Sequence, residues 1–385
     1  MTNDAPYLLD VTRLIWRRWK GRYPTGIDRV CLAYLRHFGD NSQAVVQHRR
    51  FRRILGRKAS QRLFNLLQGP SDRFRRTLPW AALQNLGDLN EQGRGRFYLN
   101  IGHTGLDFGG FQEWVHRSDL RPIYLVHDLI PITDPQFCRS GEADRHRNRM
   151  RSALKTGAGI IGNSQATIDQ LRAFAASEEL PMPPALAAWL GVDALPAPAE
   201  FSRSRSPTFV VLSTIEARKN HLMLLRIWSR LIDRFGDAAP RLLIIGQRGW
   251  EAEPVFDLLD NSEKLRGHVV ELKSCSDEEL ASHLRSATAL LFPSLAEGYG
   301  LPLLEALGLG VPAIASDLPV FREIAGEIPE YLAADNDVAW ESAILDYADS
   351  EGVRRQRQLV RLRGFEPPSW ESHFKRIEDW LRTLR

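Results

Sequence analysis

The sequence predicts an α/β protein with two domains, each built on a mainly parallel sheet covered by helices. In the second half of the chain, short apolar runs alternate regularly with helical patterns, as in sheets flanked by helices on both faces. The 385 residues suffice for two domains of ordinary size. A stretch rich in Pro, Ala and Ser at 194–207 predicts the linker between them.

Composition narrows the class of protein. No run of residues approaches the length of a membrane span, and the N-terminus lacks a basic stretch followed by an apolar one, so we expect no signal peptide. The three cysteines, at 31, 138 and 275, are far apart and have no metal-ligand spacing. This usage favours a reducing compartment. We therefore expect a cytoplasmic protein. No Asp-x-Asp metal site stands in a plausible place, and we expect no metal and no cofactor.

The first half contains several apolar runs that predict strands. These runs are Tyr7–Val11, Arg96–His103, Pro122–Pro131 and Ala158–Ser164. Ser164 is placed to cap a following helix. A helix is also expected from Val30 to Phe38, after Gly26, and a glycine at such a turn lets a phosphate or sugar approach the backbone. Asp28 and Arg29 read equally well as a capping pair.

The formal net charge is only +4, but the segment 48–76 is strongly basic, with apolar residues interleaved. A helix formed there is amphipathic and cationic, which suits anionic lipid headgroups. A solvated insertion is the alternative interpretation. Nucleic-acid binding is a third interpretation and is not the one we expect.

The second half contains the strands on which the α/β prediction depends. They are expected at Phe209–Ser213, Leu242–Gly246, Val269–Leu272 and Ala289–Phe292. Ser276 to Leu280 has the pattern of a capping box that starts a helix. The residues from Trp370 to Arg385 form an amphipathic pattern.

Arg218 and Lys219 follow the strand expected at Phe209–Ser213. Two adjacent cations at the end of a buried parallel strand are unfavourable unless an anion offsets them, and a diphosphate is a natural choice. The alternative is a charged helix start. Cations at a helix N-terminus oppose the helix dipole, which argues against it.

The stretch 293–307 follows the strand expected at Ala289–Phe292. Gly298 and Gly300 allow close approach of the backbone, and Pro302 suits a first helical turn. The free N–H groups of such a turn form an anion site. Glu297 before the turn and Glu305 inside the helix place carboxylates on both sides of it. A nucleoside diphosphate sugar fits this pattern. An ordinary strand–turn–helix with two surface glutamates is the alternative.

Two glutamates seven residues apart around Gly-Tyr-Gly-Leu-Pro, together with Arg218-Lys219, resemble the signature of glycosyltransferase family 4. The segments 310–317 and 122–131 are also similar to the family pattern. The resemblance implies the GT-B fold, in which two Rossmann-like domains face each other across a cleft and a C-terminal helix crosses back. It implies an acceptor domain at 1–195, a nucleotide-sugar domain at 196–368, and a helix at 369–385 on the first domain.

The same resemblance implies roles for the candidate site residues. Catalytic roles fall to Glu297, which contacts donor-sugar hydroxyls, to His127, which faces the donor sugar, and to Arg218 and Lys219 at the diphosphate. Glu305 binds the ribose, and the other donor-binding residues are Gly298, Tyr299, Gly300, Leu301 and Gly26. Only Gly26 represents the family's Gly-rich loop on the acceptor side, where relatives have two glycines.

The implied function is a retaining, metal-independent hexosyltransferase that moves a sugar to a glycan or lipid-linked acceptor in surface polysaccharide synthesis. Mannose from GDP-mannose is our first choice of donor, followed by dTDP-rhamnose and UDP-hexoses. We expect no nucleic-acid partner, and a cytoplasmic location that extends to the inner face of the membrane if residues 48–76 bind lipid. The rival interpretations are a sugar phosphorylase, a nucleotide-sugar epimerase, or a non-enzymatic protein that binds membranes or polyanions.

Overall fold

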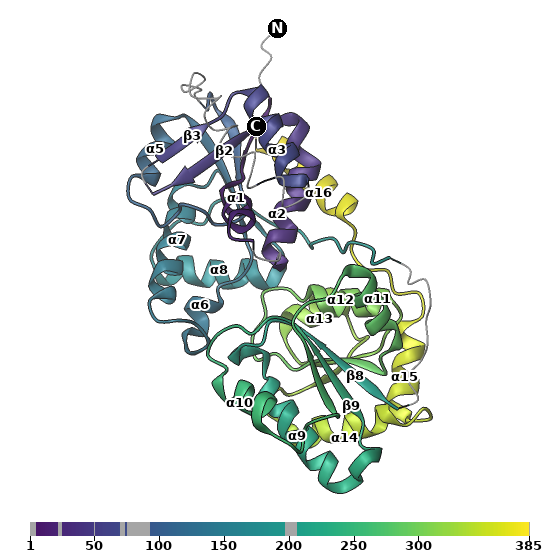
Figure 1. Ribbon diagram of the computed structural model, residues 1–385. Coiled ribbons are helices and arrows are strands. Elements are labelled where there is room, and N and C mark those ends of the chain that lie inside the picture. Colours follow the sequence, from purple (N-terminus) through teal and green to yellow (C-terminus); the bar gives the residue numbers. More distant parts are fainter. Residues whose placement is uncertain are drawn as a thin grey trace. The chain divides into compact units, whose positions relative to one another are not determined.

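The computed structural model describes residues 5–21, 25–49, 51–69, 74, 93–196 and 206–384. The chain divides into two compact units (Figure 1). The first comprises Met1–Ile132, Ala143–Leu190 and Trp370–Arg385, and the second Thr133–Glu142 and Gly191–Ser369. Most of the expected linker at 194–207 lies outside the described residues.

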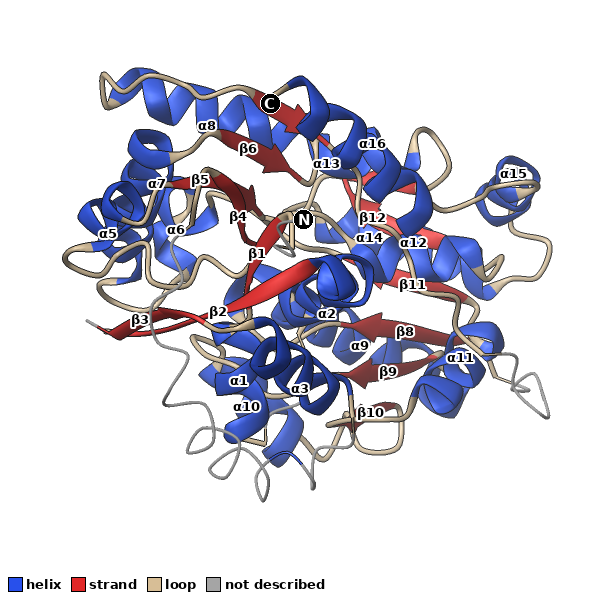
Figure 2. Ribbon diagram, turned by 90° about the horizontal axis from the view of Figure 1, so that it is seen from above, coloured by secondary structure: helices blue, strands red, loops and turns tan. Residues whose placement is uncertain are grey.

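The first unit is built on a sheet with the strand order β3-β2-β1-β4-β5-β6-β7 in the described part of the chain (Figure 2). The strands are β1 (Tyr7–Asp10), β2 (Ser42–His48), β3 (Phe51–Ile54), β4 (Arg96–Asn100), β5 (Leu120–Val126), β6 (Gly159–Gly162) and β7 (Ala185–Ala187). Only β3 is antiparallel to its neighbour among these strands. The central strands β5 and β6 are largely apolar, as expected for parallel strands buried on both faces.

The helices of this unit pack on the sheet through buried apolar side chains. They are α1 (Thr12–Trp19), α2 (Gly26–Phe38), α3 (Arg57–Gln68), α5 (Phe111–Arg117), α6 (Ile130–Thr133), α7 (Glu142–Thr156), α8 (Gln165–Ser177) and α16 (Trp370–Thr383). One core cluster joins Tyr98 and Tyr124 of the sheet to Trp114 of α5. A second joins Ile160 to Met150 of α7 and Leu171 of α8.

The C-terminal helix α16 belongs to this first unit, as predicted. Its His373 lies between two partners: Nδ1 is 2.9 Å from the carbonyl oxygen of Trp189, and Nε2 is 3.0 Å from the hydroxyl of Tyr34. Because a carbonyl oxygen only accepts, Nδ1 carries the proton and Nε2 accepts from the tyrosine. Phe374 packs edge-on against Tyr34. The last helix is therefore anchored by both apolar packing and matched hydrogen bonds.

The second unit has an all-parallel sheet with the order β10-β9-β8-β11-β12-β13 among the described strands. The strands are β8 (Thr208–Leu212), β9 (Arg241–Ile245), β10 (Val269–Leu272), β11 (Ala289–Phe292), β12 (Ala313–Ser316) and β13 (Glu330–Leu332). The helices are α9 (His221–Phe235), α10 (Glu253–Asn261), α11 (Asp277–Ser286), α12 (Leu301–Gly308), α13 (Pro319–Ala325), α14 (Asp337–Ala348) and α15 (Val353–Leu362). This order is that of a doubly wound, Rossmann-like fold.

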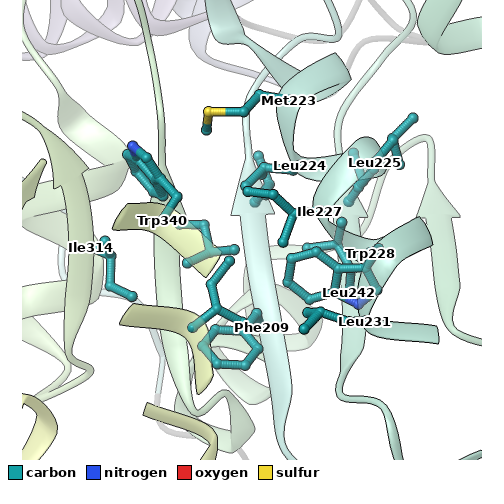
Figure 3. Close-up of a cluster of buried hydrophobic side chains, with 14 of the residues drawn as sticks. Phe209, Met223, Leu224, Leu225, Ile227, Trp228, Leu231, Leu242, Ile314 and Trp340 are labelled. Atoms are coloured by element: carbon teal, nitrogen blue, oxygen red, sulfur yellow. The ribbon is translucent and has the colours of Figure 1, made fainter. Parts of the chain in front are cut away.

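Helices α9 and α14 lie on one side of this sheet, and α11 and α12 lie on the other (Figure 1). On the α9 side, Trp228 and Trp340 pack with Phe209 of β8 in one fully buried cluster (Figure 3). Trp228 also donates its indole N–H to the carbonyl oxygen of Pro240 at 2.8 Å. A rigid sheet core therefore supports the loops that follow β8 and β11.

The structure corrects some expected elements. Residues 51–54 form strand β3 rather than part of a cationic helix, because they pair with β2 in antiparallel register. Helix α2 begins at Gly26, four residues before the predicted start, and residues 130–131 belong to α6 rather than to a strand. The capping box at Ser276 is confirmed: its hydroxyl accepts from the N–H of Glu279. Among the described residues, no helix has the length and apolar character needed to cross a membrane.

Candidate functional site

Strands β8 and β11 are neighbours at the centre of the second sheet, and the chain winds outward from them in opposite directions. At such a switch point the loops after the two strands diverge, and ligands of doubly wound folds bind there. The segment with Arg218 and Lys219 follows β8, and the stretch beginning at Pro293 follows β11. Sheet order thus brings together two patterns that lie about 80 residues apart in the sequence.

The loop after β8 ends in a single 3-10 turn, Ala217–Lys219. Asn220 then adopts the left-handed conformation, with φ of 57°, and helix α9 begins at His221. Asparagine tolerates this conformation better than other non-glycine residues. Its side-chain amide donates to the carbonyl oxygen of Ala334 at 2.9 Å. The turn therefore holds Arg218 and Lys219 at the end of a fixed segment.

The loop after β11 depends on Gly300. Its φ is +122°, and a Cβ atom there lies 2.9 Å from the ring of Phe321, so a larger residue is excluded by both conformation and space. Pro302 sits in the first turn of α12, as predicted. The N–H of Leu295 donates to the carbonyl oxygen of Arg218 at 2.7 Å, which ties this loop to the one after β8.

Four charged side chains form a compact ion cluster between these loops. Arg218 donates from Nη1 to Oε2 of Glu297 at 3.0 Å and pairs through Nη2 with Oε1 of Glu216 at 2.6 Å. Lys219 pairs with Oε1 of Glu297, which also accepts from Ser294 at 2.8 Å. The cluster contains two cations and two carboxylates, so its formal charges cancel.

Burial and charge act in opposite directions on these groups. Burial alone raises the pKa of Glu297, but attraction to Lys219 and Arg218 outweighs it and lowers the pKa to about 2. Burial and Arg218 lower the pKa of Lys219, and Glu297 opposes that change. Burial raises the pKa of Glu216, and the two cations only partly offset it. Glu297 is therefore firmly ionised at neutral pH.

The sequence analysis missed Glu216, although the residue stands two positions before Arg218. Its side chain is 2% exposed, and its Oε2 atom is buried without a hydrogen-bond partner among the described residues. Because Oε1 receives the guanidinium, Glu216 fixes the direction in which Arg218 points. In the sequence, its role was indicated only by its position close to two cations after an expected strand.

The remaining predicted residues of this unit lie along the start of α12. Tyr299 is buried, Gly300 is the N-cap residue, and Leu301 is the first residue of the helix. Glu305 is 3% exposed and lies in the second turn, so it is not a surface glutamate. The interpretation of this stretch as an ordinary turn with two surface carboxylates is therefore wrong.

His127 belongs to the first unit, where it directly follows β5. Its Nε2 atom is 2.8 Å from the carbonyl oxygen of Ile101, and its own carbonyl accepts from the amide of Asn163 at 2.8 Å. Burial lowers the pKa of His127 to about 4, although the hydrogen bond to Ile101 and the charge of Asp128 oppose the change. The imidazole is therefore neutral at pH 7. The Asn-Ser-x-x-Thr segment at 163–167 thus positions His127 as well as capping α8.

Two further histidines lie close to His127 and were not predicted as site residues. The ring of His103 is 5.3 Å from that of His127 and 5.7 Å from that of His146, measured between centroids. His146 comes from α7, and its Nε2 atom is 3.0 Å from the carbonyl oxygen of Asp128. Only His103 offered a signal in the sequence, since it follows a strand as His127 does.

Gly26 is the first residue of α2 and is exposed. The helix N-terminus is served by a capping box, in which Asp28 accepts from the N–H and hydroxyl of Thr25, both at 2.7 Å. Asp28 also pairs with Arg13 and Arg17, each at 2.7 Å. The capping interpretation of Asp28 is confirmed. A carboxylate of the chain itself caps this helix end, and the donor-binding role expected for Gly26 stays a prediction.

Within the described residues, no group of three or more His, Cys, Asp or Glu side chains is arranged to hold a metal ion. The metal independence expected from the sequence stays a prediction. Arg218 and Lys219 are the groups in this cluster that offer positive charge to an anionic ligand.

Comparison with known proteins identifies the family of this chain. The family model for glycosyl transferases group 1 matches residues 197–357. The O-antigen chain mannosyltransferase B of Escherichia coli is 30% identical over 276 residues, which cover 67% of this chain and 68% of that protein. The chain belongs to the group 1 glycosyl transferases.

A further curated relative matches over a shorter part of its length. The serotype-specific mannosyltransferase WbdA of Escherichia coli is 28% identical over 234 residues, or 56% of this chain. The matched part is only 28% of WbdA. Among solved structures, HepE of Anabaena in complex with UDP-glucose superposes with a TM-score of 0.67 at 12% identity, covering 98% of this chain and 99% of that one. That likeness confirms the predicted GT-B fold class.

The buried neutral histidines make the stability of this group 1 protein sensitive to acid. Burial lowers the pKa of His373 to about 4, and His127 has the same shift. Because the unfolded chain then binds more protons below the ordinary pKa of 6.5, we expect full stability above about pH 6.5 and a loss as the pH falls towards 4. The free energy of unfolding in urea at pH 7.5, 6 and 5 measures this.

Replacement of His373 by Asn keeps a donor for the carbonyl of Trp189 and removes one titrating group. It should lower stability at pH 7.5 yet flatten the fall between pH 6.5 and 4. His116→Asn, at an exposed position of α5, serves as control. An identical pH dependence in wild type and His373→Asn contradicts the prediction.

Proposed function

We propose that this protein is a retaining hexosyltransferase that transfers mannose from GDP-mannose to a glycan or lipid-linked acceptor. The observation that carries the proposal is the ion cluster of Arg218, Lys219 and Glu297 at the switch point of a group 1 glycosyl transferase. Relatives named as mannosyltransferases of O-antigen chains support the choice of sugar. We assign the acceptor to residues 1–195 and the donor to residues 196–368.

The two cations are the centre of the proposed chemistry. In the transfer, the bond between the anomeric carbon and the diphosphate oxygen breaks, and a bond to the acceptor hydroxyl oxygen forms. The diphosphate gains negative charge as it leaves and takes up the acceptor proton. Arg218 and Lys219 stabilise that charge, together with the N–H groups at the start of α12. Positive charge already fixed in place lowers the barrier without a metal ion.

Glu297 performs two tasks in this proposal. It pairs with both cations, which offsets the cost of burying them. It also accepts hydrogen bonds from the hydroxyl groups of the donor sugar. A bound diphosphate shares Arg218 and Lys219 with this carboxylate, and the carboxylate oxygens then become available to the sugar. Glu305 is proposed to bind the ribose, and Gly298, Tyr299, Gly300 and Leu301 the remaining donor groups.

The proposed role of His127 is to face the donor sugar. Its Nε2–H is donated to Ile101, which leaves Nδ1 as an acceptor for a sugar hydroxyl. We propose that Glu216 and Glu297 act as counterions rather than as nucleophiles, because both pair with the cations. Transfer then proceeds by front-face attack assisted by the diphosphate, with retention at the anomeric carbon.

The alternatives differ in what they require. A phosphorylase with this fold needs inorganic phosphate, and an epimerase changes the donor without an acceptor. A non-enzymatic protein that binds membranes or polyanions needs no nucleotide site. Transfer from dTDP-rhamnose or a UDP-hexose differs only in the donor, and HepE was solved with UDP-glucose.

Thermal unfolding with GDP, UDP, dTDP and ADP, first without and then with Mg²⁺, tests the donor site. A nucleotide at 100 times its dissociation constant adds about 2.7 kcal/mol to stability. We expect selective stabilisation by GDP in the absence of metal. Selective stabilisation by UDP or dTDP names a different donor, and no response to any of them overturns the donor site.

Substitutions in the ion cluster test its part in catalysis. Lys219→Ala removes a donor that stabilises charge on the leaving diphosphate, and Glu297→Gln removes the charge that pairs with both cations. Each substitution should lower turnover roughly 10²-fold or more. Lys273→Ala and Glu278→Gln, at exposed positions of the same unit, are matched controls. Turnover is measured per folded protein, established by thermal unfolding. Near wild-type turnover in either cluster variant rules out the site assignment.

We also propose that the first unit contacts an anionic membrane. Part of the basic segment 48–76 lies outside the described residues, and Arg52 within it is buried, donating to the carbonyl oxygens of Gly109 and Gly110. The supporting observation is the basic-aromatic face formed by Trp16 and Trp19 of α1, the following residue Lys20, and Phe51 of β3. Trp16, Trp19 and Phe51 are 42%, 47% and 50% exposed, although large apolar side chains favour burial.

This face combines groups that suit a lipid interface. Lys20 lies over the ring of Trp16, and that ring packs 5.5 Å from His48 at the end of β2. Aromatic rings insert at the level of the headgroups, and cations attract anionic lipid. We therefore propose a cytoplasmic location at the inner face of the membrane.

Vesicle sedimentation tests the basic-aromatic face. Replacement of Trp16 and Trp19 together by Ala should weaken binding to vesicles with anionic lipid about tenfold or more, because two aromatic side chains lose apolar burial. Trp189→Ala is the matched control, since that tryptophan is 45% exposed in the same unit. Equal binding by the double variant and the control contradicts the proposal.

A further inference from the structure

The ends of β4 and β5 are joined by a pair of crossed hydrogen bonds from histidine side chains. Nε2 of His103 is 2.8 Å from the carbonyl oxygen of Leu125, and Nε2 of His127 is 2.8 Å from the carbonyl oxygen of Ile101. Each ring thus binds the main chain two residues before the other histidine. We call this arrangement the histidine clasp.

The clasp determines the protonation of both rings. A carbonyl oxygen only accepts, so Nε2 carries the proton in His103 and in His127. Burial lowers the pKa of His103 well below its ordinary value, and the neighbouring His127 and His146 lower it further. Both rings are therefore neutral at pH 7, and the Nδ1 atom of each is left as a hydrogen-bond acceptor.

The backbone at His103 adopts an unfavourable conformation to make this contact. Its φ is 56°, in the left-handed region that a residue with a side chain seldom adopts. Such a conformation persists where the surroundings enforce it, often at functional sites. Here Asn100 bonds both the N–H of Thr104, at 3.2 Å, and its carbonyl oxygen, at 2.8 Å. The turn is therefore built to direct His103 towards β5.

The main chain around His127 is fixed independently of the clasp. Asn163 donates to the carbonyl oxygen of His127, and His146 binds that of Asp128. What these contacts leave undetermined is the rotation and tautomer of the His127 ring. Its Nε2–H points at Ile101, and the turn that follows Ile101 is tied to β5 by His103.

We propose that His103 is a positioning residue that acts through His127. It holds the carbonyl of Ile101 where that carbonyl fixes the ring of His127, so that Nδ1 is the atom presented to a donor hydroxyl. This inference rests on the proposed function, in which His127 faces the donor sugar. A purely structural role for His103 predicts lower stability with unchanged activity per folded molecule.

Two variants separate these roles. His103→Asn keeps tolerance of the left-handed backbone but is too short to reach Leu125. His103→Gln places its amide N–H about where Nε2–H lies in histidine and keeps the donor. His116→Asn, at an exposed position of the same unit, is the control for loss of a histidine. We expect His103→Asn to lower kcat about tenfold to 100-fold with little change in the donor KM, and His103→Gln to recover most of it.

A double-mutant cycle with His127→Ala decides whether His103 acts through His127. In that background, His103→Asn should have no further effect on kcat per folded molecule. The inference is overturned if the two losses multiply, or if His103→Asn lowers only the melting temperature.

A second readout requires no activity. The ¹⁵N chemical shifts of the His127 ring should show a single Nε2–H tautomer in the wild type and a mixture of tautomers in His103→Asn. An unchanged tautomer in that variant overturns the clasp, whatever the enzyme does. A wild type that shows the expected tautomer but transfers no sugar overturns the proposed function and leaves the clasp in place.

Discussion

The neutral cluster of two cations and two carboxylates is the constraint on which the second unit depends. Arg218 and Lys219 are held just beyond the carboxyl end of the central strand β8, where an unpaired buried charge is very unfavourable. Glu297 and Glu216 offset them, and the bond from Leu295 to Arg218 keeps the two loops in register. The requirements for burying these charges and for placing them at a ligand site are met by the same contacts.

The first unit meets a similar requirement with neutral groups. The ends of β4 and β5 are followed by His103 and His127, whose proton positions are set by main-chain carbonyls rather than by opposite charges. At the end of β1, the buried carboxyl of Asp10 accepts from the hydroxyl of Tyr98 and from the N–H of Thr12, and burial raises its pKa. A strand end that presents acceptors and donors without net charge suits sugar hydroxyls, whereas the cations of the second unit suit phosphate.

The sequence predicts features that depend on local patterns, and it misses features that depend on contacts between distant segments. Glu297 and Arg218 were predicted together because both follow apolar runs of a parallel sheet, whose carboxyl ends meet at one edge. The strand at 51–54 was mistaken for helix because its pairing with β2 and the burial of Arg52 are tertiary effects that override the local pattern. The clasp escaped notice because it needs a left-handed turn at His103, which no spacing in the sequence indicates.

The contrast between Glu216 and Glu297 shows how one cluster serves two purposes. Glu216 has one oxygen on Arg218 and the other buried, and its raised pKa reflects an environment that offers little beyond the two cations. Glu297 has both oxygens engaged and a pKa near 2, so its charge is the stable counterion of the pair. A diphosphate that draws the cations towards itself relieves Glu297 of that task while Glu216 still holds Arg218 in direction. In the proposed function, the two carboxylates therefore have different tasks: Glu216 orients the cation, and Glu297 exchanges partners with the ligand.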